Sequence, residues 1–473
     1  MILALSLMSA PAFAQTPGPC RSALRMGGRP DTIDSISSVD FPIKVHWNRP
    51  QDAAKAQLVL DYAELSWQVQ IDELGFRAPP LPDDAHGPEL DYYLSNVGAG
   101  EAYAEVADWD DQVDGDNYNS ATSYMVIDQN LNDAWIPSYI AHEFNHVLQW
   151  GTDFSEPTLP IWEGVAVAAQ DWTLGYDEGH WELDVDSFQE APWLPSLTGD
   201  SYESWYRWGV GYFYEYGTAL WVMHLDEVVG TGDGTAGSRL WDNASQEGMP
   251  NEPDAVDAFA TTAGVALGTA LNDLARTRWL VGPEWDDRGL AEARNWEGAQ
   301  MVPVEGFTAA DLPLVDFKFD SRPMITGQAF VEVDDLDTTD TLVAQVSSED
   351  ALGSGILVLW WAVDGSVGEV QGHGGDPVVE LPLQDIERIV VAVTNLGPPG
   401  WDGDDNAYLR GDQRLQLSVV VSSTTPTDPS ATDSSPSGKR GSAERGGCGC
   451  DSGSLPTLWW MVALVFAMHR SRR

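Results

Sequence analysis

The stretch Ala141-His142-Glu143-Phe144-Asn145-His146-Val147-Leu148-Gln149-Trp150 decides how the rest of the chain is interpreted. It contains an HExxH pattern inside a run typical of a helix, and residues four apart on a helix lie on the same face. His142 and His146 are therefore expected to point toward one ion, with Glu143 beside them. A zinc ion held by two imidazoles and a third ligand lowers the pKa of water to about 7, and a nearby carboxylate can accept its proton.

A plainer interpretation is an amphipathic helix with two surface histidines. The residues around the motif argue against it, because they are apolar on several sides: Ile140, Ala141, Phe144, Val147 and Leu148. Such a helix is expected to be buried, and buried histidines beside a glutamate need polar partners. A shared cation would supply one, so the pattern predicts a zinc site with Glu143 as the general base.

The third ligand has to come from outside the motif, and two completions fit poorly. A metzincin pattern needs Gly at position 149 and His or Asp at position 152, where the chain has Gln149 and Thr152. An aspzincin-like GTxD pattern needs an acid where Phe154 stands, because Asp153 falls one place early. Both completions are therefore disfavoured.

A glutamate further along the chain fits better. Glu163-Gly164-Val165-Ala166 opens an apolar helical run to Asp171, and Glu163 follows His146 by 17 residues. A second helix beside the first can then bring Glu163 to the ion. His180 remains the reserve candidate for this ligand, and Asp171 is a candidate to orient a zinc-bound histidine.

The E-G-x-A segment after HExxH resembles the arrangement of gluzincins, and AHEFNHVLQ with WEGVA resembles secreted bacterial peptidases of the hyicolysin type. The resemblance implies a zinc metalloendopeptidase in which Glu143 is base and acid and a tyrosine stabilises the oxyanion. A Tyr-Gly pair that opens a helix over Ala219 to Val229 gives this role to Tyr216, with Tyr212 as second choice. No good match to the amine-binding motif of aminopeptidases is seen, which disfavours an exopeptidase.

The order of elements predicts an α+β fold of zincin type over residues 41–305. Alternation predicts strands at 41–48, 90–95, 102–106 and 122–128, while helical spacing covers 51–74, the motif itself and 252–281. From residue 306 to 421 short alternating segments predict an all-β sandwich as an accessory domain. Its expected strands are 329–333, 341–346, 356–363, 378–382, 388–395 and 415–421.

The charge of the chain limits its partners. A net charge of −50, from 74 acidic and 24 basic residues, disfavours nucleic-acid binding and suits a secreted protein. Calcium is a further expectation at two Asp-rich loops, although solvated polar turns explain them equally well. These loops contain Asp108, Asp110, Asp114 and Asp116, and the run 401–406.

Both ends of the chain indicate export. Residues 1–14 end in Ala12-Phe13-Ala14 and are typical of a signal peptide, which leaves 15–40 as an N-terminal segment. A Ser/Thr/Pro/Asp-rich linker, 422–447, precedes a tail, 448–473, with Cys448-Gly449-Cys450, a short apolar run and terminal arginines. The tail resembles C-terminal sorting signals of the MYXO-CTERM type. This implies processing at the cell surface by sorting machinery and only transient membrane contact; a short membrane anchor is the alternative.

Two other functions stay open at this point. The zincin-like part could be inactive, with the sandwich acting as a surface binding or adhesion module, although an intact Glu143 argues against a decayed enzyme. A zinc hydrolase could also act on a bond other than a peptide bond. Protein or peptide substrates are the expectation that the resemblance favours.

Overall fold

The structure is a computed structural model of the 473-residue chain. It describes residues 29–82, 87–97, 101–108, 118–154, 156, 158–175, 182–199, 209, 213–245, 253–295, 302–336, 339–348, 352–401 and 415–422. Several predicted features lie outside the described residues: the predicted signal peptide, the predicted sorting tail, His180, Tyr212, Asp110, Asp114, Asp116 and residues 402–406.

A mixed five-stranded sheet begins the fold, in the order β1-β2-β3-β5-β4. Its strands are β1 (Asp34–Ser37), β2 (Ile43–Trp47), β3 (Leu90–Ser95), β4 (Ala102–Asp108) and β5 (Thr122–Asp128). β2, β3 and β5 are parallel, whereas β1 and β4 run antiparallel at the two edges. The predicted strands are confirmed, and β1 is an addition whose polar sequence gives no alternation signal.

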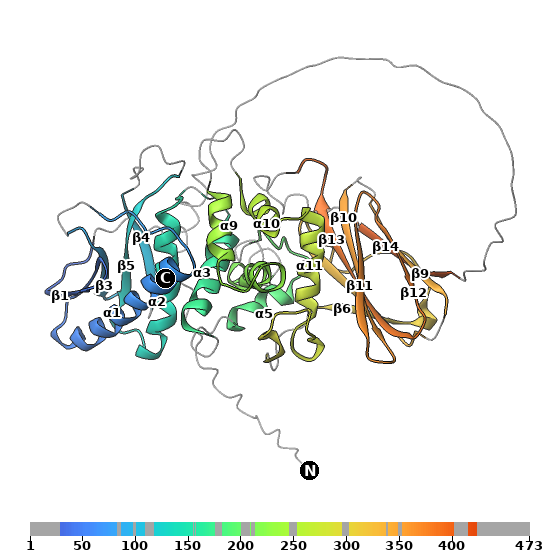
Figure 1. Cartoon of the computed structure of the whole chain (residues 1–473), viewed down its shortest axis with the longest axis horizontal. Helices are drawn as coiled ribbons and strands as arrows, with labels where there is room; N and C mark the ends of the chain where they lie inside the picture. The colour runs from blue at the N-terminus through green and yellow to red at the C-terminus, as the bar shows by residue number, and fades with distance from the viewer. Residues whose placement is uncertain are drawn as a thin grey trace, which may run out of the picture. The chain divides into compact units, whose positions relative to one another are not determined.

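The alternation of side chains along these strands separates two faces of the sheet. Val45, Tyr92 and Met125 are fully buried on the face that packs against helices. Tyr93 and Tyr124 lie in a small cluster on the opposite face. One face of the sheet therefore packs against helices, among them the helix that contains the motif, in the blue part of the ribbon in Figure 1.

Two helical segments pack on the first face. α1 (Ala53–Trp67) continues directly into a π-helix, η2 (Gln68–Glu73), so the predicted helix over 51–74 contains a change of winding. α2 (Ile136–Trp150) contains the HExxH motif and contacts α1, β4, β5 and the next helix, α3. Every residue from Ser138 to Gln149 is buried, as expected for a helix with apolar residues on several sides.

A largely helical half follows. Its helices are α3 (Leu159–Leu174), α5 (Glu182–Glu190), α7 (Tyr214–Gly217), α8 (Ala219–Met223), α9 (Ala236–Ala244), α10 (Ala255–Ala263) and α11 (Leu267–Trp279), with a π-helix, η5 (His224–Val229), after α8. α3 begins four residues before the predicted start at Glu163, because Pro160 is compatible with a first helical turn. Glu163 is therefore not at the start of its helix.

The C-terminal part of the described chain is a β-sandwich. One sheet has the order β11-β10-β13-β8-β6 and the other β12-β9-β14-β7, and their inner faces share one apolar core. The strands are β6 (Val304–Thr308), β7 (Leu314–Phe317), β8 (Gln328–Asp334), β9 (Thr341–Ser348), β10 (Gly353–Ala362), β11 (Val367–Gly374), β12 (Val378–Pro382), β13 (Ile386–Gly397) and β14 (Leu415–Ser422). The six predicted strands are present, and β6, β7 and β11 are additional.

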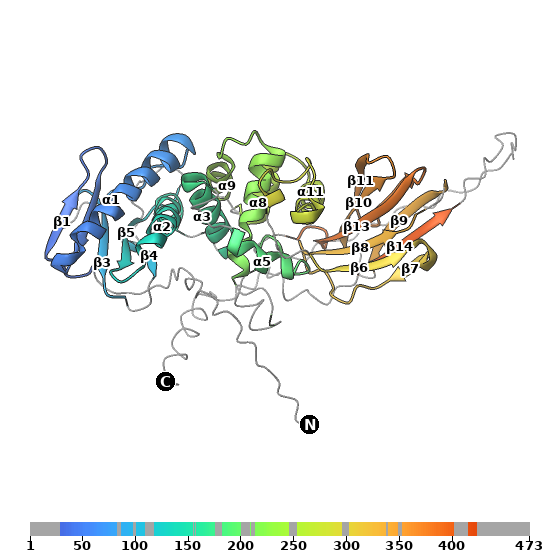
Figure 2. The same ribbon diagram turned by 90° about the horizontal axis from the view of Figure 1, so that it is seen from below.

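The helical half and the sandwich are in direct contact. α11 packs on β10 and β13, as Figure 2 shows, and a small apolar cluster joins Trp279 to Phe330 of β8. Arg278 of α11 is fully buried and donates to Phe188 O, to Gln189 Oε1 at 3.2 Å and to Ser196 Oγ at 3.1 Å. Contacts group these parts into one compact unit that ends at Thr424.

None of the helices in the described ranges is both long enough and apolar enough to span a membrane.

Candidate metal centre

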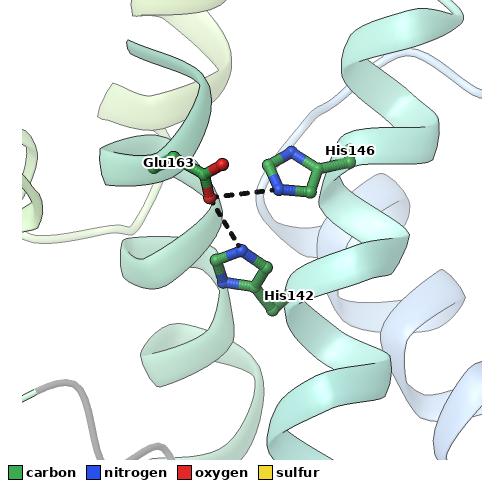
Figure 3. Close-up of side chains that lie close together, drawn as sticks. All are labelled: His142, His146 and Glu163. Carbon is green, nitrogen blue, oxygen red and sulfur yellow. Dashed lines mark hydrogen bonds and ion pairs between the residues drawn. The ribbon is translucent and has the colours of Figure 1, made fainter. Parts of the chain in front are cut away.

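His142, His146 and Glu163 come together between α2 and α3. Glu163 Oε2 lies 3.2 Å from His142 Nε2 and 3.3 Å from His146 Nε2, as Figure 3 shows. All three residues are nearly inaccessible, at 2% exposure for each histidine and 3% for the glutamate. The two helices thus face each other across a single cluster of nitrogen and oxygen donors.

The spacing of these atoms fits a shared ion. Bonds of about 2.0–2.1 Å in a tetrahedral site place neighbouring ligand atoms about 3.3 Å apart, close to the two separations given above. The ligand atoms of all three residues lie within 4.8 Å of one another. No other cluster of three or more His, Cys, Asp or Glu in the described ranges has this compactness.

Each histidine has a glutamine on its other nitrogen. His142 Nδ1 lies 3.2 Å from Gln170 Oε1 on α3, and His146 Nδ1 lies 2.7 Å from Gln149 Oε1 on α2. An amide oxygen only accepts, so both Nδ1 atoms donate to the glutamines and both Nε2 atoms face the glutamate. Such outer partners fix the tautomer and orientation of metal-binding imidazoles.

In the metal-free chain the cluster is a buried ion pair. Burial lowers the pKa of His146, but the charge and hydrogen bond of Glu163 outweigh it and raise that pKa to about 9. Burial raises the pKa of Glu163, but the two histidines outweigh it and lower that pKa to about 2. A cation that takes the place of the histidine proton would satisfy the same carboxylate.

Glu143 lies to one side of this cluster. One residue along a helix is a rotation of about 100°, so Glu143 follows His142 but faces the sheet. Its side chain is fully buried, and its Oε2 accepts a hydrogen bond from Ala104 N of the edge strand β4 at 2.8 Å. The carboxylate is therefore held between the motif helix and the edge of the sheet.

Tyr216 stacks beside His142. Its ring is nearly parallel to the imidazole, with centroids 5.8 Å apart and an interplanar angle of 17°. The structure therefore brings the tyrosine predicted from the Tyr-Gly pair next to the cluster, on α7. Its side chain is 7% exposed.

Gly164 explains how α7 and α8 come so close to α3. A Cβ atom at this position would lie 2.3 Å from Thr218 Oγ1 and 3.1 Å from the carbonyl carbon of Thr218, which is too close for any side chain. Thr218 Oγ1 also donates to Pro160 O at 3.0 Å. The glycine after Glu163 thus permits the helix contact that places Tyr216.

Sequence reasoning missed the two glutamines. Gln149 served only to exclude a metzincin pattern, although it stands three residues after His146 on the same helix face. Gln170 stands seven residues, or about two turns, after Glu163, so it shares that residue's face. Gln170, the residue before the predicted candidate Asp171, is the partner of His142 Nδ1.

Comparisons with known proteins do not assign the chain to a family. No family model matches the chain, and no curated protein matches it. Among solved structures it is similar to CorA, a surface-associated copper-binding protein important in Methylomicrobium album BG8 copper acquisition, at 9% identity and a TM-score of 0.17, over 25% of this chain and 98% of that chain.

It is also similar to BtGH115A, a family GH115 4-O-methyl-α-glucuronidase with specificity for decorated arabinogalactans. This likeness has 9% identity and a TM-score of 0.14, over 61% of this chain and 42% of that chain. At such TM-scores neither structure bears on the fold or function of this protein.

Proposed function

We propose that the chain is an exported zinc-dependent metallopeptidase that cleaves peptide bonds within protein chains. The observation that supports this most directly is the buried cluster of His142, His146 and Glu163 with Glu143 beside it. Two imidazoles and one carboxylate are a donor set used by catalytic zinc. Catalytic zinc sites combine three protein ligands with a water or substrate, and His142, His146 and Glu163 would supply these three.

Peptide hydrolysis at this site would need a Lewis acid, a general base and an oxyanion donor. Bound zinc would supply a Lewis acid and lower the pKa of water. Glu143, held in orientation by Ala104 N, would accept a proton from the attacking water and deliver it to the leaving nitrogen. The Tyr216 hydroxyl would donate a hydrogen bond to the oxyanion that develops on the substrate carbonyl.

The edge strand suggests how a peptide would bind. β4 pairs with β5 on one side and ends the sheet on the other. An extended peptide can add to such an edge through main-chain hydrogen bonds. Glu143 occupies Ala104 N in the middle of this strand, so a peptide that paired with β4 beyond Ala104 would pass next to the proposed base.

The function is tested by zinc content and by cleavage of casein with wild type and Glu143→Gln. Wild type is expected to contain one zinc per chain and to cleave casein, while Glu143→Gln keeps zinc and loses cleavage. Zinc-free wild type, or equal cleavage by both proteins, contradicts the proposal. Zinc binding without cleavage of any protein would instead favour a surface binding role.

Surface sorting is part of the proposal and has a separate test. Cys448→Ser with Cys450→Ser is expected to keep the protein off the cell surface, measured by protease shaving of intact cells. The matched control is Cys20→Ser, which changes a cysteine far from the tail. Unchanged surface display in the double variant would remove the role assigned to the Cys-Gly-Cys segment.

A further inference from the structure

Gln70 has a fully buried side-chain amide and lies in the π-helix η2, which contacts the motif helix α2. A π-helix has a wider turn than an α-helix, and here Leu74 N bonds back five residues to Val69 O at 2.9 Å. Such segments occur often at functional sites.

The Gln70 side chain bonds to both helices of the metal centre. Its Nε2 donates to Ala141 O of α2 at 2.8 Å and to Thr173 Oγ1 of α3 at 3.2 Å. Its Oε1 accepts from Asn145 Nδ2 of α2 at 3.1 Å. One amide thus joins three helical segments that are far apart in the chain.

The positions of these partners relate Gln70 to the ligands. Ala141 and Asn145 are the residues that directly precede His142 and His146. Thr173 stands three residues after Gln170, the partner of His142 Nδ1. A shift of α2 against α3 would therefore break hydrogen bonds of a buried amide, which costs about 1–3 kcal/mol for each group left unsatisfied.

We infer that Gln70 is a positioning residue that sets the separation of α2 and α3 and so tunes the affinity of the three-residue cluster for a metal ion. The inference rests on the proposed metal binding and goes beyond it, because Gln70 contacts none of the three metal-binding side chains in the contacts above. It acts through the backbone before one histidine, through Asn145 before the other, and through α3.

The test compares zinc affinity of wild type, Gln70→Met and Gln57→Met by competition with a chelator. Met conserves volume and removes the three hydrogen bonds, so zinc affinity is expected to fall about 10-fold, at the lower end of the range for loss of an outer partner. Gln57→Met is the matched control. Gln57 lies on α1, which precedes η2, and is exposed; its Nε2 bonds to Asp61 Oδ1 at 2.7 Å on the same helix, so the zinc affinity of Gln57→Met should not change.

Two further readouts separate positioning from general stability. The visible spectrum of the cobalt-substituted protein should change in Gln70→Met, because it reports ligand geometry. The rise in melting temperature on zinc addition should also be smaller, because stabilisation by a ligand follows its affinity. Equal affinity and an unchanged cobalt spectrum in Gln70→Met would overturn the inference, even if the apo protein is less stable.

Thr173→Val keeps the inference testable if Gln70→Met does not fold. It removes the bond from Gln70 to α3, together with the bond from Thr173 Oγ1 to Ala169 O within α3, and a smaller loss of zinc affinity than in Gln70→Met is expected. Wild-type affinity and an unchanged cobalt spectrum in Thr173→Val would contradict a role in spacing the helices. Absence of zinc from wild type would instead reject the proposed function and is distinguishable from both outcomes.

Discussion

Gln170 on α3 and His142 on α2 meet through Oε1 and Nδ1 at 3.2 Å, so the helix that supplies the carboxylate also orients the opposite imidazole. His146 is oriented differently, by Gln149 of its own helix at 2.7 Å. Gln149 Nε2 in turn donates to Trp162 O of α3 at 3.0 Å. Both histidines are therefore tied to the helix that contains Glu163.

Replacement of either glutamine is expected to weaken zinc binding. Gln170→Met and Gln149→Met should each lower zinc affinity by about 10–100-fold, as is usual for outer partners of metal-binding histidines. Competition with a chelator measures the effect. Gln68→Met, at the start of η2, is the control for a glutamine substitution away from the cluster. Unchanged affinity in both variants would show that the glutamines do not orient the ligands.

Glu163 is expected to matter more than either glutamine. Glu163→Ala removes a proposed ligand and leaves two buried histidines, so zinc affinity should fall by more than the ~10–100-fold expected for an outer partner. His180→Ala tests the reserve ligand and should keep full zinc content. Zinc loss in His180→Ala with zinc retained in Glu163→Ala would move the third ligand to His180.

Tyr216→Phe separates catalysis from metal binding. Loss of one oxyanion donor commonly lowers kcat by about 10²–10³-fold, and zinc content should stay at the wild-type level. Tyr214→Phe is the control, because it removes a hydroxyl that bonds to Leu194 O from the same short helix. Equal kcat values for wild type and Tyr216→Phe would exclude the hydroxyl from the reaction.

Glu156 gives the stability of the protein a pH dependence. Burial raises the pKa of Glu156 from 4.5 to about 8 against the opposing hydrogen bonds of Thr158, and the charges of Asp153 and Asp254 raise it further. The folded chain thus holds this proton at higher pH than the unfolded chain, so its stabilising effect is full below about pH 4.5 and is lost as pH rises through about 8.

Glu156→Gln mimics the protonated acid and is expected to raise the melting temperature at pH 8 and above, with little effect near pH 4. Thermal unfolding at both pH values measures this difference. Glu387→Gln, at an exposed position on β13, is the control. A gain in stability that is the same at both pH values would contradict the proton-linked explanation.

Arg278 is expected to be essential for stability. Burial lowers the pKa of its guanidinium to about 10, and its bonds to Phe188 O, Gln189 and Ser196 would all be lost in Arg278→Met. Unsatisfied buried acceptors cost about 1–3 kcal/mol each, so a loss of several kcal/mol in unfolding free energy is expected in urea titrations. Arg276→Met, which breaks a part-exposed pair with Glu369, should cost about 1 kcal/mol or less. Similar losses in both variants would argue against the buried network.

The sequence predicts much of the fold because its signal is periodic. The parallel strands and α2 are found from apolar spacing, since each buries most of its residues. β1 is not predicted because its residues are largely exposed and show no apolar alternation. The π-helix is not predicted because apolar spacing does not distinguish it from a continuing α-helix. Gln70 is consequently absent from any sequence-based prediction.

The site was predictable where titratable residues have a fixed spacing. His142, His146 and Glu163 follow from a motif and a helix beside it, and the structure brings them together. The glutamines give no such signal, because neutral amides are common on helices. The sequence offers Asp171 to orient a zinc-bound histidine, whereas the oxygen found at His142 Nδ1 belongs to Gln170, and one residue on a helix turns a side chain by about 100°.

The bond between Ala104 N and Glu143 also bears on self-association. The outer edge of a sheet offers unpaired main-chain groups that can join the same edge of another molecule, which is a route to aggregation. A buried carboxylate fixed to Ala104 N obstructs pairing at that one residue, because a second strand that covered the whole edge would have to displace it at the cost of an unpaired charge. Glu143→Ala, the usual way to inactivate a site of this kind, would also remove this protection. Glu143→Gln keeps an oxygen acceptor at the edge, so it is the better inactive variant for work at high protein concentration.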